Sequence, residues 1–509
     1  MLWLLLSVLS SAVALYVLNS AHTPSNNGRP LPHPSDTLPL LGNAIRFLQP
    51  RHQLFTWFLT QQRQFSGQTY AISVPSLPPG VVISSPENLE FVLRNESLVT
   101  KGDFFRTRAW DLFGHGIINA TGPLWKAQRK AGLRFFSGET LDVMVEEVLP
   151  EFWTDIVEKR LDEASATDYK EWTTVDLQHV FHDLTTAIMG QMAYDIPALN
   201  SSHPFSRAFD FASGWTATRF QNPLYTFTEL FNGGKFRKAV AEVKHFGLQI
   251  VARAKRRRGN RAFESLVEGN DAPQFNTLID SLIEAIDNPT IVADSAMNFL
   301  SAGRDTTAES LTWTTYALLR HQPVLWRLRQ EITTAFPIGT QNLTLASLQP
   351  STIPYILATF YESLRLYPPV PLEIQQCEAD CTLPDGTFLP KSSVIVFCIW
   401  ALNRSVDLWV EDAEQFRPER WLDDDGKFAG RSAWDFPVFN GGPRACLGRK
   451  MAEVLGCWVL VRLVEDWDVE EVRDGHGDRV SAISLTLPMK GGLPVRVRRR
   501  ATAATAAEM

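Results

Sequence analysis

The ten residues from Phe439 to Gly448 constrain the fold of this chain more than any other segment. They fill every fixed position of the pattern Phe-x-x-Gly-x-Arg-x-Cys-x-Gly, which arises by chance in a chain of this length with a probability on the order of 10⁻⁴. Glycines allow a backbone to turn sharply and to approach a flat ligand closely. The apolar run Lys450–Val464 predicts a helix, whose N-terminus would favour the thiolate form of Cys446. The alternative is a buried structural cysteine in a glycine-rich loop.

This loop resembles the axial-ligand loop of the cytochrome P-450 heme-thiolate enzymes, and the resemblance extends in order along nearly the whole chain. It implies a mainly α fold with a small β portion, in which a long central helix lies over a heme b. Cys446 would be the axial ligand of the iron, and a thiolate there pushes electron density toward O–O cleavage. Phe439, Arg444 and Gly448 would also bind the heme, Arg444 by pairing with a propionate.

A second match lies at Trp125-Lys126-Ala127-Gln128-Arg129. It resembles the Trp-x-x-x-Arg helix of the family, so Trp125 and Arg129 are expected to contact a heme propionate. The chain departs from the family at Gln375, near a position that often carries an Arg or His for a propionate. This departure puts the local polarity, and with it the heme affinity, in doubt.

The segment from about Asn288 to His321 has few helix breakers and predicts an unusually long helix. In its middle, the hydroxyl of Thr306 should bond to the carbonyl of Ala302, four residues earlier. The resemblance makes Asp305 and Thr306 the catalytic acid–alcohol pair that relays protons to dioxygen. Ala302 and Gly303 would border the heme, Gly303 by leaving room for oxygen. The alternative is a chance Gly-Thr kink in a core helix.

Glu362 and Arg365 match the family's Glu-x-x-Arg helix motif. An i,i+3 pair shares one helix face, but that spacing occurs about once per chain by chance. The match becomes more specific because Tyr367-Pro368-Pro369 follows it and because it lies roughly 80 residues before the cysteine loop, as in the family. The resemblance adds Arg420, in Pro-Glu-Arg-Trp, and implies a buried ion network with a structural, non-catalytic role.

The first residues differ in kind from the rest, because Leu2–Leu18 carries no charge. As a helix it would span roughly 26 Å, close to the thickness of a thin bilayer. Lys and Arg occur only after it, which favours a transmembrane anchor at 1–20 over a cleaved signal peptide. A proline-rich linker (21–43), a heme-thiolate catalytic domain (44–499) and a disordered tail (500–509) are expected to follow. Five Asn-x-Ser/Thr sequons are a weak excess over chance and do not overturn this topology.

Composition excludes two further classes. A net charge of −7 argues against nucleic acid as a partner, and five irregularly spaced cysteines are no disulfide framework. Thr69–Val74 and Val81–Ser84 alternate like strands, and the minor sheet is expected near the start of the chain and after residue 370. Gly233-Gly234 and the region of Arg256 are expected to be surface loops between helices.

The resemblance implies a monooxygenase in the endoplasmic reticulum membrane with its catalytic domain facing the cytosol. Its electrons would come from NADPH through a separate NADPH-cytochrome reductase-like flavoprotein, with a cytochrome b5-like protein as an alternative donor. Lys126, Lys130 and Arg134 recur at i, i+4 and i+8, and this basic stripe is either a docking face for the acidic flavoprotein or an ordinary solvated helix face.

The expected substrate is lipophilic, because the candidate pocket residues are apolar. These candidates are Phe104, Phe105, Trp110, Phe113, Phe299, Ala302, Val370 and Leu372. An aromatic access lid is expected from Phe205, Phe209, Phe211, Trp215, Phe220 and Phe231, with plain core as the alternative. The residues at 302–308 and 439–444 resemble most the corresponding motifs of the subgroup that hydroxylates alkanes and fatty acids in fungi and plants.

Three other functions stay open. The first is an oxidative tailoring enzyme of a polyketide or terpenoid natural-product pathway. The second is a heme-thiolate isomerase or dehydratase, although such enzymes often lack the Asp-Thr pair. The third is a non-catalytic heme-binding membrane protein, against which the intact pair argues.

Overall fold

The computed structural model describes residues 23–500 except position 76, segment 166–172, position 198 and segments 269–276 and 473–476. The predicted anchor (1–20) and the tail from 501 onward lie outside these residues, as does the start of the predicted linker. Within the described part of the chain, no helix combines the length and apolarity needed to cross a bilayer.

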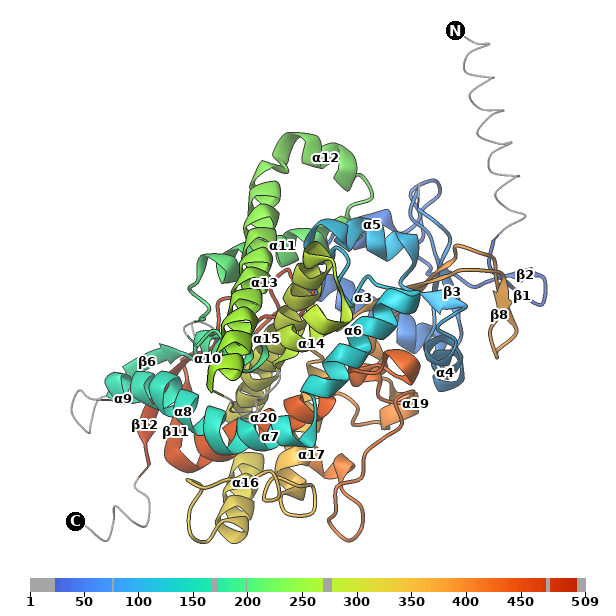
Figure 1. The fold of residues 1–509 in the computed structure, drawn as a ribbon. Coiled ribbons are helices and arrows are strands. Elements are labelled where there is room, and N and C mark those ends of the chain that lie inside the picture. Colours follow the sequence, from blue (N-terminus) through green and yellow to red (C-terminus); the bar gives the residue numbers. More distant parts are fainter. Residues whose placement is uncertain are drawn as a thin grey trace, which may run out of the picture.

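Helices make up most of the fold, and Figure 1 shows them gathered around α15. Their bounds are α2 Ala44–Phe47, α3 Arg51–Phe65, α4 Pro86–Arg94, α5 Gly102–Phe113, α6 Gly122–Phe135, α7 Gly138–Val143, α8 Leu149–Phe152, α9 Lys159–Ser165, α10 Leu177–Tyr194, α11 Pro204–Gln221, α12 Tyr225–Asn232, α13 Gly234–Glu268, α14 Leu278–Ala285, α15 Pro289–Arg320, α16 Gln322–Ala335, α17 Pro354–Leu366, α18 Ile399–Leu402, α19 Val406–Trp409 and α20 Arg449–Asp466. The turns Met144–Val148 and Trp153–Glu158 are π-helical.

Three small sheets complete the fold. The strands are β1 Ser25–Asn26, β2 Arg29–Pro30, β3 Tyr70–Ile72, β4 Gly80–Val82, β5 Val99–Thr100, β6 Thr173–Asp176, β7 Glu373–Cys377, β8 Cys381–Thr382, β9 Thr387–Leu389, β10 Val394–Phe397, β11 Trp467–Glu471 and β12 Pro494–Arg499. The sheet orders are β2-β1-β9-β8, β3-β4-β10-β7-β5 and β11-β12-β6. The pair β4–β10 is parallel and the others are antiparallel. The mainly helical fold with a minor sheet component is therefore confirmed.

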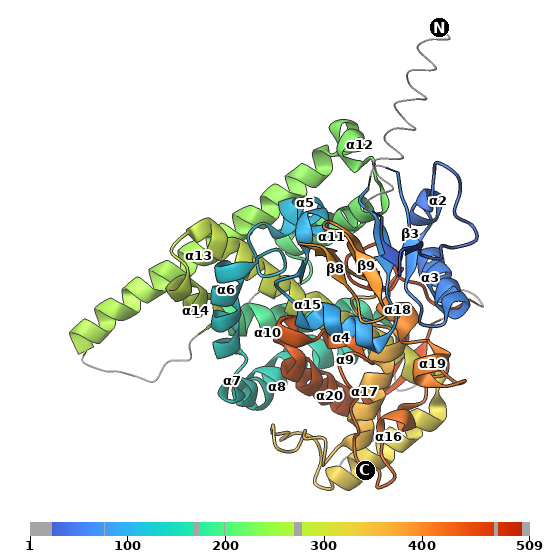
Figure 2. The same cartoon turned by 90° about the vertical axis from the view of Figure 1, so that its right-hand side faces the viewer.

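Helix α15 begins where the sequence predicts and is buried along most of its length. The Asn288 side chain caps it by accepting hydrogen bonds from the N–H groups of Thr290 (2.9 Å) and Ile291 (3.4 Å), and Pro289 follows at the first helical position. Helices α10, α13, α14 and α17 pack around it. Figure 2 shows the far end of α13 projecting away from this core.

Two expectations about local structure are wrong. The region of Arg256 lies inside α13 and is no loop. Lys and Arg are good helix formers, and Arg257 is held on the helix by Asp280 (2.6 Å) and Asp195 (2.9 Å). Strand β6 lies outside the two regions where the minor sheet was expected, because it pairs with β12, whose residues lie more than 300 positions away.

Candidate functional site

The loop that carries Cys446 is built from two short 3₁₀ turns, Pro437–Phe439 and Gly442–Arg444, placed just before α20. The Cys446 N–H donates to the Phe439 carbonyl at 2.8 Å and closes the loop. Gly442 has φ +60°, and a Cβ there would collide with the carbonyl of Leu93. Only glycine fits this position, because the backbone conformation and the close contact both exclude a side chain.

The sulfur of Cys446 lies where α20 begins. Burial raises the pKa of the Cys446 thiol, while the N–H groups of Gly448 and Arg449 and the guanidinium of Arg129 lower it. The dipole effect expected from the sequence is therefore present but smaller than the desolvation. A coordinated metal would remove the proton outright, because metal charge dominates the pKa of a bound thiol.

Beside the loop, Arg129, Arg444 and Trp125 form a cationic cluster. Arg129 Nη1 donates to the Ala445 carbonyl at 3.0 Å, and the Arg444 guanidinium lies 4.3 Å from the centre of the Trp125 ring. Burial lowers the pKa of both arginines. Arg444 also pairs with Glu96 at 2.8 Å, a residue that the sequence gave no reason to select.

Three elements converge on the inner side of this loop. A Cβ built on Gly132 of α6 would lie 2.9 Å from Phe299 of α15 and 3.1 Å from Leu447, the neighbour of Cys446. On α15 itself, Ala302 is exposed and Thr306 is half-buried, although Arg304, Asp305 and Thr307 beside them are buried. Cys446 is likewise accessible, although the protein atoms packed around its sulfur are numerous enough to raise the pKa of the thiol.

These residues fit a heme. A heme requires a thiolate ligand, cations for its propionates and an accessible surface. Cys446 supplies the thiol, and Arg129 and Arg444 supply the cations. Ala302 and Thr306 form an accessible strip of small side chains on the central helix. Gln375 is buried in β7 opposite Ile395 of β10, and its neutral amide adds no charge to the site. Gly303 does not leave open space: its missing Cβ points at Met189 of α10, within 2.6 Å of the sulfur.

Asp305 is buried beside its neighbour Arg304, whose Nε lies 2.8 Å from the carboxylate. Arg304 also pairs with Asp210 of α11. Burial raises the pKa of Asp305 to about 7, Arg304 opposes that rise, and Asp210 adds to it. Thr306 Oγ1 donates to the Ala302 carbonyl at 2.6 Å, as expected from the sequence. An acid whose pKa lies near neutral pH thus directly precedes, in the sequence, the threonine on the accessible strip.

Sequence reasoning missed the segment 484–487, which is held from two sides. Glu309 of α15 accepts hydrogen bonds from Thr486 Oγ1 and from the N–H of Leu487, both at 2.7 Å. From α3, Arg51 donates to the carbonyls of Ser484 and Thr486. Glu309 lies four residues after Asp305 and therefore on the same helix face. This spacing is the sequence signal that would have revealed Glu309.

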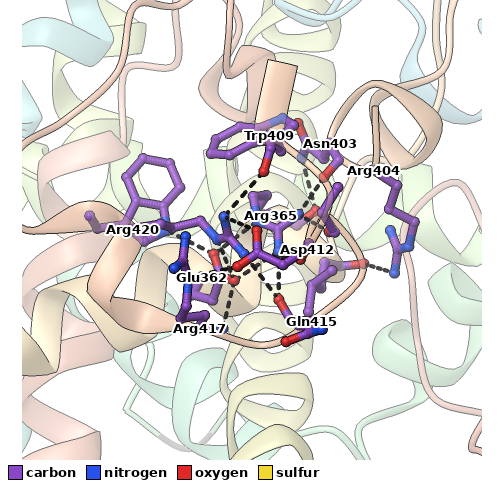
Figure 3. A network of polar contacts seen from close by, with 12 residues as sticks. Glu362, Arg365, Asn403, Arg404, Trp409, Asp412, Gln415, Arg417 and Arg420 are labelled. Atoms are coloured by element: carbon purple, nitrogen blue, oxygen red, sulfur yellow. Dashed lines mark hydrogen bonds and ion pairs between the residues drawn. The ribbon is translucent and has the colours of Figure 1, made fainter. Parts of the chain in front are cut away.

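Glu362, Arg365 and Arg420 lie together in the buried network of Figure 3. The Glu362 carboxylate accepts from Arg365 Nε and Nη2, both at 2.8 Å, and from Arg420 Nε at 2.9 Å. Arg365 also donates to the carbonyls of Asn403 and Gln415. The network ties α17 to the segment 403–421, as a structural role would require.

The candidate pocket and lid residues do not form one cluster. Phe105 and Phe220 contact each other with ring centres 5.1 Å apart, and Phe104 lies 6.4 Å from Phe220. Phe205 and Phe209, in contrast, are core residues with almost no exposed surface. The others are scattered: Phe113 is buried, Trp110, Phe211 and Phe231 are exposed, and Trp215, Val370 and Leu372 are partly buried.

Comparisons with known proteins agree with this geometry. The family model described as cytochrome P-450 matches residues 32–491. Cytochrome P-450 CYP94D108 of Paris polyphylla is 30% identical, with 91% of this chain and 92% of the relative covered. Cytochrome P-450 94B1 of Arabidopsis thaliana is 29% identical over 91% of this chain and 90% of the relative. Cytochrome P-450 monooxygenase cyp1 of Mycosarcoma maydis is 29% identical over 91% and 74%. The chain belongs to the cytochrome P-450 family of heme-dependent monooxygenases.

Proposed function

We propose that this monooxygenase hydroxylates a long-chain lipid, a fatty acid or an alkane. The observation that carries the proposal is the accessible strip of α15 with the apolar Ala302, where the buried acid Asp305 is next in sequence to Thr306 and the buried Phe299 lies one helical turn before Ala302. A proton source next to an apolar surface suits the insertion of oxygen into an unactivated C–H bond. The motif resemblance to alkane and fatty-acid hydroxylases supports the same substrate class.

The residue roles follow from the contacts. Cys446 would ligate the iron, and Arg129, Arg444 and Trp125 would hold the propionates. Phe439 and Gly448 would shape the loop around the ligand. Ala302 would border the heme face, and Gly303 would do so through its backbone alone, because its missing Cβ points at Met189. The bound heme supplies the oxygen-activating chemistry.

Proton delivery would use Asp305 and Thr306. Because the pKa of Asp305 is about 7, this carboxyl can hold a proton at neutral pH and release it again. The Thr306 hydroxyl, now bonded to the Ala302 carbonyl, would turn to pass that proton onward. The ion pair from Arg304 to the half-exposed Asp210 connects this acid with the surface of α11.

We further propose that the chain is anchored in the endoplasmic reticulum membrane by residues 1–20, with a linker at 21–43, a catalytic domain at 44–499 facing the cytosol, and a tail at 500–509. The exposed apolar side chains of helix α12 support the proposal that this helix contacts the bilayer. These are Phe227, Leu230 and Phe231, with Leu224 just before them. Leu40, Ile45 and Leu48 are exposed as well, and Gln221 donates to the Gln49 carbonyl at 3.5 Å and so connects the two segments.

Electrons reach cytochromes P-450 from a reductase, and we propose an NADPH-dependent flavoprotein, or alternatively a cytochrome b5-like donor. Lys126, Lys130 and Arg134 are exposed along α6, the helix whose Arg129 contacts the cysteine loop. Charge reversal at Lys126 and Lys130 should slow the reduction of the heme by the flavoprotein, most at low ionic strength. An unchanged rate would identify the stripe as an ordinary solvated face.

The substrate proposal is tested with the full chain in microsomes, supplied with a reductase, NADPH and long-chain fatty acids or alkanes. The ferrous–CO spectrum is the control for folding and heme binding. Hydroxylated lipids, identified by mass spectrometry, would support the proposal. A folded protein without such products would point to the tailoring of a natural product instead, and turnover without NADPH would point to an isomerase.

A further inference from the structure

Arg108 of α5 is a buried cation. The residue is 7% exposed, and its guanidinium lies 3.8 Å from the centre of the Phe104 ring and 5.4 Å from that of Tyr225. Nη1 donates to the Phe104 carbonyl at 3.0 Å, whereas the buried Nε has no hydrogen-bond partner. A buried guanidinium without an anion is unfavourable, so its retention needs an explanation.

The neighbouring Arg219 of α11, in contrast, has the carboxylate partners that a buried arginine requires. Its Nη2 pairs with Glu229 at 2.6 Å and with Asp111 at 2.7 Å, and its Nη1 donates to the Arg108 carbonyl at 3.0 Å. Arg108 has no carboxylate within ion-pair distance among the residues that the structure describes. Burial accordingly lowers the pKa of Arg108, while Glu229 and Asp111 outweigh burial and raise the pKa of Arg219.

The surroundings of Arg108 are apolar on several sides. Phe104 and Phe105 of its own helix pack against Phe220 of α11. Tyr225, next to the guanidinium, is the first residue of α12, whose remaining apolar side chains are exposed. A cation without a carboxylate partner among aromatic rings, beside an exposed apolar helix, matches an amphiphile with an anionic head and a long apolar chain.

We propose that Arg108 binds the carboxylate of a long-chain fatty acid, so that the enzyme selects acids over neutral lipids of equal length. This inference rests on the lipid substrate proposed above and specifies it. A carboxylate accepts two parallel hydrogen bonds from an arginine, and the unpartnered Nε provides one of the donors. The aromatic rings exclude water from the pair and strengthen it.

The test compares a fatty acid with its methyl ester, two ligands that differ in charge and hardly in length. Binding to the heme-loaded full chain is followed by the shift of the Soret band. The wild type should bind the acid more tightly than the ester. Arg108→Gln should weaken acid binding roughly 10- to 100-fold, as expected for a hydrogen bond to a charged group, and leave the ester unchanged. Arg108→Lys should restore part of the difference.

Arg106→Gln is the matched control, because Arg106 lies on the same helix but is partly exposed and pairs with Asp103 at 2.6 Å. It should bind acid and ester like the wild type. Equal weakening of both ligands in Arg108→Gln would overturn the inference and make Arg108 a packing residue, while lipid oxidation would persist. A wild type without preference for the acid would overturn it even if Arg108→Gln does not fold. If the wild type neither binds nor oxidises any lipid, the proposed substrate class fails, and this inference with it.

Discussion

Replacing Glu362 by Gln should destabilise the fold more than any other single change in the network of Figure 3. The carboxylate accepts from two nitrogens of Arg365, from Arg420, from the backbone N–H of Arg417 at 2.8 Å and from the Trp421 indole at 2.9 Å. An amide has one acceptor oxygen, and its NH₂ group would face donors. The substitution therefore removes the only negative charge that contacts Arg365 in the described chain.

The magnitude follows from what remains after the substitution. Arg420 keeps Asp412 at 3.1 Å, so one buried positive charge, that of Arg365, is left without an anion. Stranding one charge of a buried pair costs about 3–5 kcal/mol, a large part of the 5–15 kcal/mol that typically separates folded from unfolded domains. We expect the free energy of unfolding of the full chain to fall by that amount, with little heme-loaded protein recovered at 37 °C.

The assay is urea denaturation of the heme-loaded chain in detergent, followed by tryptophan fluorescence. Arg417→Gln is the matched control, because its guanidinium is 47% exposed and pairs with Asp412, while its backbone N–H to Glu362 is retained. It should cost less than about 1 kcal/mol. If the two variants lose the same small amount, the network does not lock the core and the reasoning is refuted.

Three further predictions concern the site. Cys446→Ser should abolish the thiolate-type Soret band of the ferrous–CO complex, and persistence of that band would disprove the ligand assignment. Thr306→Ala should increase the hydrogen peroxide released per NADPH consumed, whereas unchanged coupling would remove Thr306 from proton delivery. The carboxyl of Asp305 has an ordinary pKa of 3.8 and a folded pKa of about 7, so the folded state holds an extra proton between these values. The free energy of unfolding should fall as pH rises from about 4 to about 7, and Asp305→Asn should remove that slope; an identical slope in the variant would contradict the role of burial.

Local patterns predicted the elements that depend on local chemistry. The long helix followed from the small number of helix breakers over 288–321, and the cap at Asn288 marks its start. The strands expected at Thr69–Val74 and Val81–Ser84 from their alternation correspond to β3 and β4. The bond from Thr306 to Ala302 needs only four residues of helix and was equally predictable.

Contacts between distant segments were not predictable in this way. Glu96 and Arg444 are 348 residues apart, and no pattern in either segment points to the other. The orientation of Gly303 toward Met189 depends on how α10 packs against α15, which periodicity does not specify. The missing counter-ion of Arg108 is likewise visible only when every neighbouring helix is in place.

The contacts of Glu309 and Arg51 with segment 484–487 have a consequence for how the chain folds during synthesis. Arg51 and the carbonyl of Ser484 are separated by 433 residues. At 5–20 residues per second, the ribosome needs roughly 20–90 s to make that stretch. Arg51 of α3 must wait that long for these carbonyl partners, whereas Phe58 of the same helix packs on Phe47 and Trp57, which are made at the same time. These contacts of Arg51 can form only after residues 484–486 have been synthesised.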